Sequence, residues 1–272
     1  MPAAAPPASR PFLIPPRPPR IRIVDAGRET DLKGSMLVVG FPTHGLVGSV
    51  AVSYLVHSLD MKPVAYMTSD SFPPTVVMED GIVVAPVRFY ASRMVCGVNG
   101  KCEQLVVALS DIQPAPELLN QIGATILDWA QRRKVSLVVA VEGQPVQDPV
   151  GSEVRVVAMA NRAASAILDR YSFERASGVV TGFAGALLLS SVGRRLPVLC
   201  LVAQAHREYP DARAAARVLE TINPLVPLLL INTKPLLEKA QQIETEMRRS
   251  IQQQKESLNQ LATPAPASEM YR

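Results

Sequence analysis

The hydrophobic positions of this chain fall into short uninterrupted runs that alternate with segments of helical periodicity. Continuous apolar runs occupy residues 36–41, 135–141 and 197–203, and such runs are typical of strands buried on both faces of a parallel sheet. An amphipathic pattern predicts a helix over residues 117–132, and an apolar run at 183–192 predicts an interior helix. Strands that alternate with helices indicate an α/β protein.

Turn signals add antiparallel hairpins to this pattern. Asp80-Gly81 and Asn99-Gly100 are strong hairpin dipeptides, and each lies between two apolar segments. These segments are residues 75–79 and 82–88 at the first turn and residues 89–96 and 102–110 at the second. The other predicted elements are strands at 63–67 and 153–157 and helices at 47–59, 160–170 and 211–219. The sequence therefore predicts a three-layer α/β/α sandwich with a mixed, largely parallel sheet.

The two ends of the chain differ from this body. Residues 1–33 begin with a proline-dense stretch that buries too little apolar surface to fold, so we predict a disordered arm before a core domain at 34–233. The arm is either a ligand for a proline-reading domain or a plain leader. Residues 234–261 predict one long C-terminal helix with a narrow apolar stripe. The prolines that follow end it and leave a flexible tail at 262–272.

Charge and composition argue against two classes of partner. The net charge is +4 over 272 residues, but several arginines belong to the N-terminal arm, and aromatic residues make up only 5%. Nucleic-acid platforms need basic and aromatic residues side by side, so we expect no nucleic acid partner. No apolar run is long enough to cross a bilayer, and the proline-dense N-terminus does not resemble a signal peptide.

The three cysteines favour a reducing environment. An odd, sparse set at Cys96, Cys102 and Cys200 argues against a disulfide framework and for a cytoplasmic location. Cys96 and Cys102 flank the second hairpin turn, so they are either ordinary buried thiols or a redox pair. The three histidines are scattered and show no zinc-ligand spacing, so no metal site is predicted.

Candidate chemistry is confined to the ends of the predicted strands. Open α/β sheets bind ligands beyond the carboxyl ends of their strands, where this chain places His44, Asp111 and Glu142. A histidine that meets two carboxylates is suited to acid–base work, but polar residues also begin loops and cap helices. The glycine-rich turn at 40–48 either cradles an anion or allows close helix packing. It lacks the phosphate-loop and dinucleotide patterns, so no cofactor is predicted.

The last three residues, Met270-Tyr271-Arg272, are unusual for a tail. Tails normally end in small or charged residues, whereas this one ends in a thioether, a phenol ring and a cation. The tail is either presented to a partner by the folded body or is a frayed terminus without a role.

Taken together, the motifs resemble the proteasome assembly chaperone 2 family, including its archaeal members, over roughly residues 34–250. The motifs that carry the resemblance are Gly40-Phe-Pro, Gly45-Leu-Val-Gly48, Asp80-Gly81, Glu142-Gly143, Gly182-Phe-Ala-Gly185-Ala-Leu-Leu and Pro210-Asp211-Ala. The resemblance implies an α/β/α core, association into homo-oligomers or with a paralogue, and ATP-independent binding to the proteasome core particle without catalysis.

The resemblance also implies a role for the tail. Proteasome partners commonly end in hydrophobic–Tyr–any residue, which inserts between adjacent α subunits of the core particle, and Met270, Tyr271 and Arg272 match that pattern. Met270 would fill an apolar slot, Tyr271 would add an apolar face with a polar tip, and the Arg272 carboxylate would pair with a lysine. Two other hypotheses stay open: a ligand-binding or hydrolytic α/β enzyme using the strand-end crevice, and a scaffold recruited through the N-terminal arm.

Overall fold

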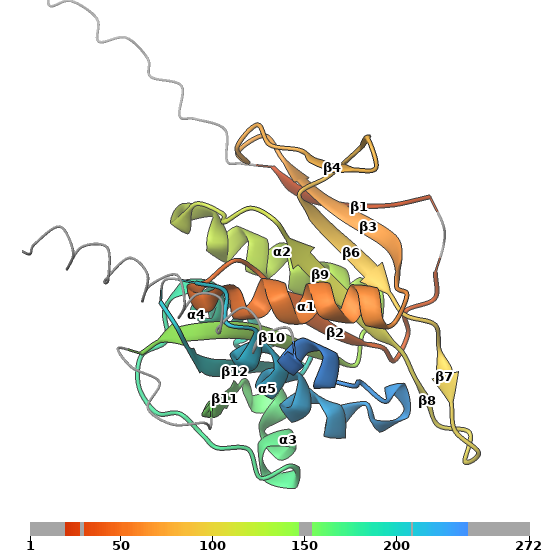
Figure 1. Cartoon of the computed structure of the whole chain (residues 1–272), viewed down its shortest axis with the longest axis vertical. Helices are drawn as coiled ribbons and strands as arrows, with labels where there is room; N and C mark the ends of the chain where they lie inside the picture. The colour runs from red at the N-terminus through yellow and green to blue at the C-terminus, as the bar shows by residue number, and fades with distance from the viewer. Residues whose placement is uncertain (1–19, 28–29, 147–153, 208, 239–272) are drawn as a thin grey trace, which may run out of the picture.

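The computed structural model describes residues 20–27, 30–146, 154–207 and 209–238 (Figure 1). Eight strands form the central sheet in the order β1-β3-β6-β9-β2-β10-β12-β11, and the pairs β4-β5 and β7-β8 form separate hairpins. The sheet strands are β1 (Ile21–Asp25), β2 (Met36–Gly40), β3 (Lys62–Ser69), β6 (Val87–Ala91), β9 (Leu105–Ser110), β10 (Leu137–Pro145), β11 (Val156–Ala160) and β12 (Val198–Ala205). The hairpin strands are β4 (Val77–Glu79), β5 (Ile82–Val84), β7 (Val95–Cys96) and β8 (Cys102–Glu103).

Helices and short 3-10 turns lie between these strands and after the last of them. The helices are α1 (Val47–Ser58), α2 (Leu119–Arg132), α3 (Ser165–Arg170), α4 (Gly182–Ser191) and α5 (Ala212–Ile222). The 3-10 turns among the described residues are η1 (His44–Leu46), η2 (Pro116–Leu118), η3 (Arg162–Ala164), η4 (Asn223–Leu225) and η5 (Pro227–Leu229). Helices α1 and α5 pack together on one face of the sheet, and α2 and α4 pack together on the other (Figure 1).

The middle of the sheet is parallel and its flanks are antiparallel. β9 pairs with β2, β2 with β10 and β10 with β12 in parallel register. The pairs β1–β3, β3–β6, β6–β9 and β12–β11 are antiparallel. The predicted three-layer sandwich with a mixed sheet is therefore confirmed, and the parallel pairing joins its four central strands.

Strand β2 explains why uninterrupted apolar runs lie at the centre. Met36 and Val38 belong to the core on the α1/α5 side, whereas Leu37 and Val39 belong to the core on the α2/α4 side. All five residues of β2 are buried. A polar side chain on either face would lose its hydration, so both alternating sets of positions are apolar.

The predicted boundary of the N-terminal arm is wrong. Residues 1–33 were expected to precede the folded body, but Ile21–Asp25 forms strand β1 and pairs antiparallel with β3. Ile21 and Leu32 are buried. The alternation of polar and apolar residues from Arg20 to Ile23 is a strand pattern, and the prolines immediately before it obscured the signal. Residues 1–19 lie outside the described part of the chain.

One further boundary differs from the expectation, and one agrees with it as far as the described residues extend. The segment predicted as one strand at 82–88 is divided into β5 and β6, because Pro86 between them has no N–H to donate to a ladder. Residues 234–238 are helical, as predicted for the start of the C-terminal helix. The rest of that predicted helix and the 262–272 tail lie outside the described residues.

Candidate functional site

A pocket of about 620 Å³ lies beyond the carboxyl ends of β10 and β12. Two of the three residues predicted to share a crevice, His44 and Glu142, line this pocket together with the turn at residues 176–182. His44 is exposed on η1, which follows β2, and Glu142 is half-buried near the end of β10. The location agrees with the rule that open α/β sheets present ligand sites at this edge.

The Glu142 carboxylate caps the N-terminus of α4. Its Oε2 accepts the backbone N–H of Ala184 at 2.8 Å, and the N–H of Phe183 also donates to this side chain. Burial raises the pKa of the Glu142 carboxyl above its ordinary value, while the two backbone N–H groups act in the opposite direction. Gly182 has φ +71°, and a Cβ there would lie 2.9 Å from Glu142 Oε1. The fold thus uses this carboxylate to satisfy the first turn of α4.

The glycines around this pocket serve close packing. A Cβ on Gly40 would lie 2.3 Å from the carbonyl oxygen of Gly48, and one on Gly48 would lie 2.6 Å from the carbonyl oxygen of Val141. A Cβ on Gly143 would lie 2.0 Å from the carbonyl oxygen of His44. These approaches bring η1 and α1 directly against β10, so the packing interpretation of the glycine-rich turn accounts for its sequence.

Asp111 does not join His44 and Glu142. It follows β9, which is separated from β10 by β2, and its Oδ2 accepts a hydrogen bond from Nη1 of the buried Arg88 at 2.7 Å. Arg88 also donates to the Tyr90 hydroxyl and to the Ala85 carbonyl, both at 2.7 Å. Glu79 of the β4–β5 hairpin lies 3.2 Å from Arg88. Asp111 therefore neutralises the arginine that ties this hairpin to the sheet.

The predicted convergence of three residues is wrong for Asp111, and the acid–base hypothesis loses one of its two carboxylates. The remaining carboxylate, Glu142, already accepts two backbone N–H groups. Among the described residues, no group of three or more His, Cys, Asp or Glu side chains is placed to hold a metal ion. Cys200 is fully buried, and burial raises the pKa of its thiol, so this thiol is not activated as a nucleophile.

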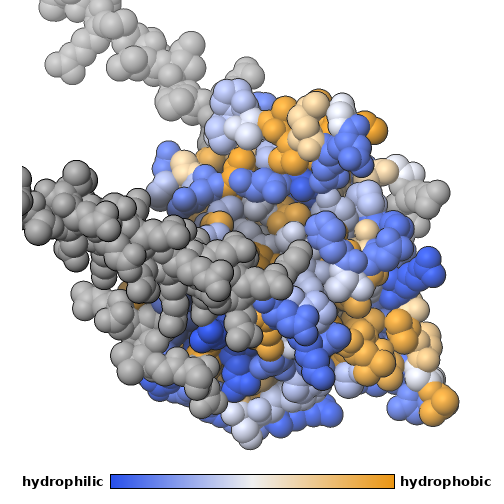
Figure 2. Space-filling model, viewed as in Figure 1, coloured by the Kyte–Doolittle hydropathy of each residue, from blue (hydrophilic) through white to orange (hydrophobic). Residues whose placement is uncertain are grey.

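The hairpins expose apolar side chains that the sequence analysis did not assign to any site. Figure 2 shows apolar surface over the β4–β5 hairpin and again near β7–β8. Met78 and Ile82 are 60% and 68% exposed in the first hairpin, and Val95 and Val98 are exposed in the second. The available signal was the lack of polar alternation around Asp80-Gly81, where a solvated two-stranded hairpin would carry polar residues on at least one face. Exposed apolar clusters of this kind mark interaction surfaces.

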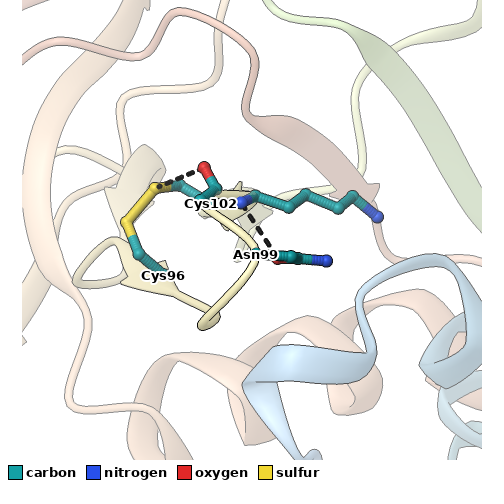
Figure 3. Close-up of a disulfide and its surroundings, with 5 residues drawn as sticks. Cys96, Asn99 and Cys102 are labelled. Atoms are coloured by element: carbon teal, nitrogen blue, oxygen red, sulfur yellow. Dashed lines mark hydrogen bonds between the residues drawn. A yellow bond between two sulfur atoms is a disulfide. The ribbon is translucent and has the colours of Figure 1, made fainter.

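Of the two interpretations left open for Cys96 and Cys102, that of ordinary buried thiols is wrong and the pair is the one that the structure shows. Cys96 and Cys102 lie directly opposite each other in the β7–β8 pair and form a disulfide with a Cα–Cα distance of 3.9 Å (Figure 3). Both residues are exposed rather than buried. The turn between them is closed by the Asn99 side chain, which accepts the N–H of Lys101 at 3.0 Å. The hairpin extends away from the body, so these sulfurs lie outside the hydrophobic core.

The predicted partner-binding residues Met270, Tyr271 and Arg272 lie outside the described part of the chain. Their role stays a prediction. Within the described ranges, no helix is both long enough and apolar enough to cross a membrane.

The fold and sequence are similar to those of known proteins. The chain matches the PAC2 family over residues 37–251. An uncharacterised protein of Methanocaldococcus jannaschii is 26% identical over 225 residues, which cover 82% of this chain and 88% of that protein. The crystal structure of Pyrococcus furiosus PbaA, an archaeal homolog of proteasome-assembly chaperone, matches with a TM-score of 0.73 and 26% identity, covering 89% of this chain and 95% of PbaA. P. furiosus PbaB, an archaeal proteasome activator, shares the fold, with a TM-score of 0.72, 22% identity and coverages of 85% and 98%.

The mixed eight-stranded sheet, covered by two helices on each face, defines an α/β/α protein of the architecture found in archaeal homologues of proteasome assembly chaperones. The family match extends over most of the described chain, and the chain belongs to the PAC2 family. The resemblance found in the sequence motifs is thereby confirmed.

Proposed function

We propose that this chain is a proteasome-binding chaperone that inserts Met270, Tyr271 and the Arg272 carboxylate between neighbouring α subunits of the core particle, in the cytoplasm and without ATP or catalysis. The observation that carries the proposal is the combination of a PAC2 body with a hydrophobic–Tyr–any sequence at 270–272. The 26% identity to PbaA, a homolog of proteasome-assembly chaperone, supports the choice of partner.

Each tail residue has a distinct task in this proposal. Met270 is unbranched and polarisable, so it adapts to a shallow apolar slot between two subunits. Tyr271 buries a large apolar face while its hydroxyl stays hydrogen-bonded. The terminal carboxylate of Arg272 pairs with a lysine of the pocket, and the Arg272 side chain itself contributes little.

The segment before residues 270–272 determines how far these residues can extend from the rest of the chain. Residues 262–269 form a linker of alanine, proline and small polar residues, whose span as a flexible coil is about 15 Å. One tail of this size binds weakly. A homo-oligomer or a complex with a paralogue that presents several tails to one ring gains affinity without any new contact. Light scattering tests this part, because a strict monomer has no such gain.

The direct test is co-purification with the proteasome core particle of the organism that encodes this chain. Removal of residues 270–272 should reduce binding by at least about 30-fold, since buried aromatic anchors contribute about 2 kcal/mol or more. Thermal unfolding of the same variant checks that the described body is intact. Binding at the wild-type level would exclude the tail mechanism.

Two matched variants separate the contributions of the carboxylate and the side chain. Arg272→Ala keeps the terminal carboxylate and should bind like the wild type. Addition of two glycines after Arg272 moves the carboxylate away from its lysine and should reduce binding nearly as much as the deletion. Strong binding by the extended chain would exclude a role for the carboxylate.

A further inference from the structure

A second concave surface lies at the opposite end of α4 from the Glu142 pocket. It has a volume of about 750 Å³ and is lined by the end of α4, the turn at residues 191–195 and the start of η3. We call it the α4 groove. Its apolar lining includes Leu189 and Val192, which are 64% and 74% exposed. Neither side chain belongs to the two hydrophobic clusters of the core, so apolar surface is exposed to solvent at this end of α4.

The rim of the α4 groove is cationic. Arg162, Arg194 and Arg195 all line it. Arg194 is held in place because its Nη1 donates to Asp128 at 2.6 Å and its Nε donates to the Ser190 carbonyl at 2.7 Å. Arg162 and Arg195 are exposed, and within the described residues their side chains form no hydrogen bond or ion pair.

No Asp or Glu is found among the described residues that line the α4 groove. The surface therefore combines exposed apolar side chains with two guanidinium groups, those of Arg162 and Arg195, that pair with no carboxylate of the described residues. Its complement is a short segment that carries carboxylates on either side of apolar side chains, because guanidinium groups bind carboxylates in a defined fork geometry.

The chain itself contains such a segment. Glu269 precedes Met270 and Tyr271, and the Arg272 carboxylate follows them, so two carboxylates flank two apolar side chains. We propose that the α4 groove holds the tail of the same molecule, with Met270 and Tyr271 against Leu189 and Val192 and the carboxylates toward Arg162 and Arg195. The Arg272 side chain stays in water.

The chain is long enough to reach the α4 groove from the last described residue. About 34 residues follow Glu238, and fully extended they would span roughly 110 Å. If residues 234–261 form the predicted helix, that helix is roughly 40 Å long, and the tail adds roughly 35 Å when extended. A domain of about 200 residues has a radius of gyration of roughly 17 Å, so any point on its surface is within range.

This docking would regulate binding to the proteasome, so its biological role rests on the proposed function. A tail held in the α4 groove is unavailable to the proteasome, so the two sites compete for the same residues. Exposed ion pairs contribute little, and a tethered segment has an effective concentration on the order of 1 mM. A groove with a dissociation constant between about one quarter of that value and that value holds the tail for about half to four-fifths of the time, and the apparent affinity for the proteasome falls about two- to fivefold.

The test measures how fast carboxypeptidase B removes Arg272 from the full chain, with intact mass as the readout and no proteasome present. The groove variant combines Leu189→Ser with Arg195→Ser. Its control combines Val179→Ser with Arg93→Ser, which removes an exposed apolar side chain and an exposed cation outside the α4 groove. We expect the groove variant to lose Arg272 about two- to fivefold faster than the wild type and the control.

Three outcomes overturn the proposal. Equal rates for the groove variant and the wild type show that the α4 groove does not hold the tail. An equal acceleration in the control shows only a general effect of surface charge. Protection that grows with protein concentration assigns the docked tail to a second molecule. Circular dichroism on both variants establishes that the body is folded, as expected for substitutions at exposed positions.

A separate binding assay distinguishes failure of this inference from failure of the proposed function. If both hold, the groove variant binds the proteasome core particle about two- to fivefold more tightly than the wild type. If the tail has no part in proteasome binding, the affinity is unchanged while the carboxypeptidase difference persists. If only the α4 groove proposal fails, deletion of residues 270–272 still reduces binding by at least about 30-fold, while the groove variant behaves as the wild type in both assays.

Discussion

The two ends of α4 differ in whether their polar and apolar groups find partners within the fold. At the N-terminus, Glu142 accepts backbone N–H groups of the first turn, and glycines bring η1 directly against β10. At the C-terminus, Leu189 and Val192 are exposed, and Arg195 has no partner among the described residues. The groups at the first end are satisfied within the fold, whereas the second end leaves apolar and cationic side chains exposed.

This contrast indicates where function is to be sought. The strand-end pocket has the position of an enzyme site, yet its carboxylate is committed to capping a helix. The α4 groove is far less conspicuous in the sequence, but its exposed groups are what binding to a partner segment requires. A pocket in the expected place is thus weaker support for a binding function than polar and apolar groups that the fold does not use.

Among variants at the two ends of α4, Gly143→Ala should lower the free energy of unfolding the most. The added Cβ would lie 2.0 Å from the His44 carbonyl oxygen, so β10 and η1 must separate, at a cost of about 3 kcal/mol. Gly193→Ala at the other end meets no atom within 4 Å but has φ +78°, and should cost about 1–2 kcal/mol. Urea unfolding of both variants measures the difference, and equal costs would contradict the account of a closely packed N-terminal end.

A smaller loss of stability is expected for Glu142→Ala. It removes the acceptor of two backbone N–H groups at the start of α4, and unsatisfied buried donors cost about 1–3 kcal/mol. Glu142→Gln keeps one acceptor oxygen and should recover part of that loss. If Glu142→Ala were as stable as the wild type in urea, the carboxylate would not be the cap that completes this end of the helix.

The free energy of unfolding should also depend on pH differently in the wild type and in Glu142→Gln. The pKa of the Glu142 carboxyl is raised by burial, so its favourable contribution is present below the unfolded-state pKa of about 4.3 and is lost as pH rises through the folded-state pKa. The wild type should therefore become less stable relative to Glu142→Gln as pH increases from about 4 upward. A change in the opposite direction would mean that the folded protein favours the charged carboxylate.

The smallest effect on stability is expected at the α4 groove. Leu189→Ser and Arg195→Ser change exposed side chains that the core does not use, so each should alter the free energy of unfolding by less than about 0.5 kcal/mol. A loss above about 1 kcal/mol in urea would show that these residues support the fold and would remove the contrast between the two ends of α4.

The sequence predicted the centre of the fold better than its periphery. Apolar runs at residues 36–41, 135–141 and 197–203 correspond to β2, β10 and β12, because strands buried on both faces leave an unmistakable pattern. Strand β1 was missed, because one short alternating segment beside a proline-dense stretch gives a weak signal. Local sequence patterns indicate which positions are buried, but they do not indicate which strands pair with one another.

The candidate sites were predictable only in part. His44 and Glu142 share a pocket because His44 follows β2 and Glu142 lies near the end of β10, and the carboxyl ends of these parallel strands meet at one edge. Asp111 was misplaced because the buried Arg88, which draws its carboxylate away, comes from β6 and is brought to it by antiparallel pairing. The α4 groove joins residues near 162 and near 190 that only the tertiary structure brings together.

The most direct measurement of the central claim is competition between the full chain and a synthetic peptide of residues 262–272 for the proteasome core particle. The account predicts that the free-acid peptide displaces the chain at millimolar concentration. The same peptide with a C-terminal amide should be much weaker, because it lacks the carboxylate. Equal displacement by both peptides, or none by either, would contradict a tail that binds through Tyr271 and the carboxylate of Arg272.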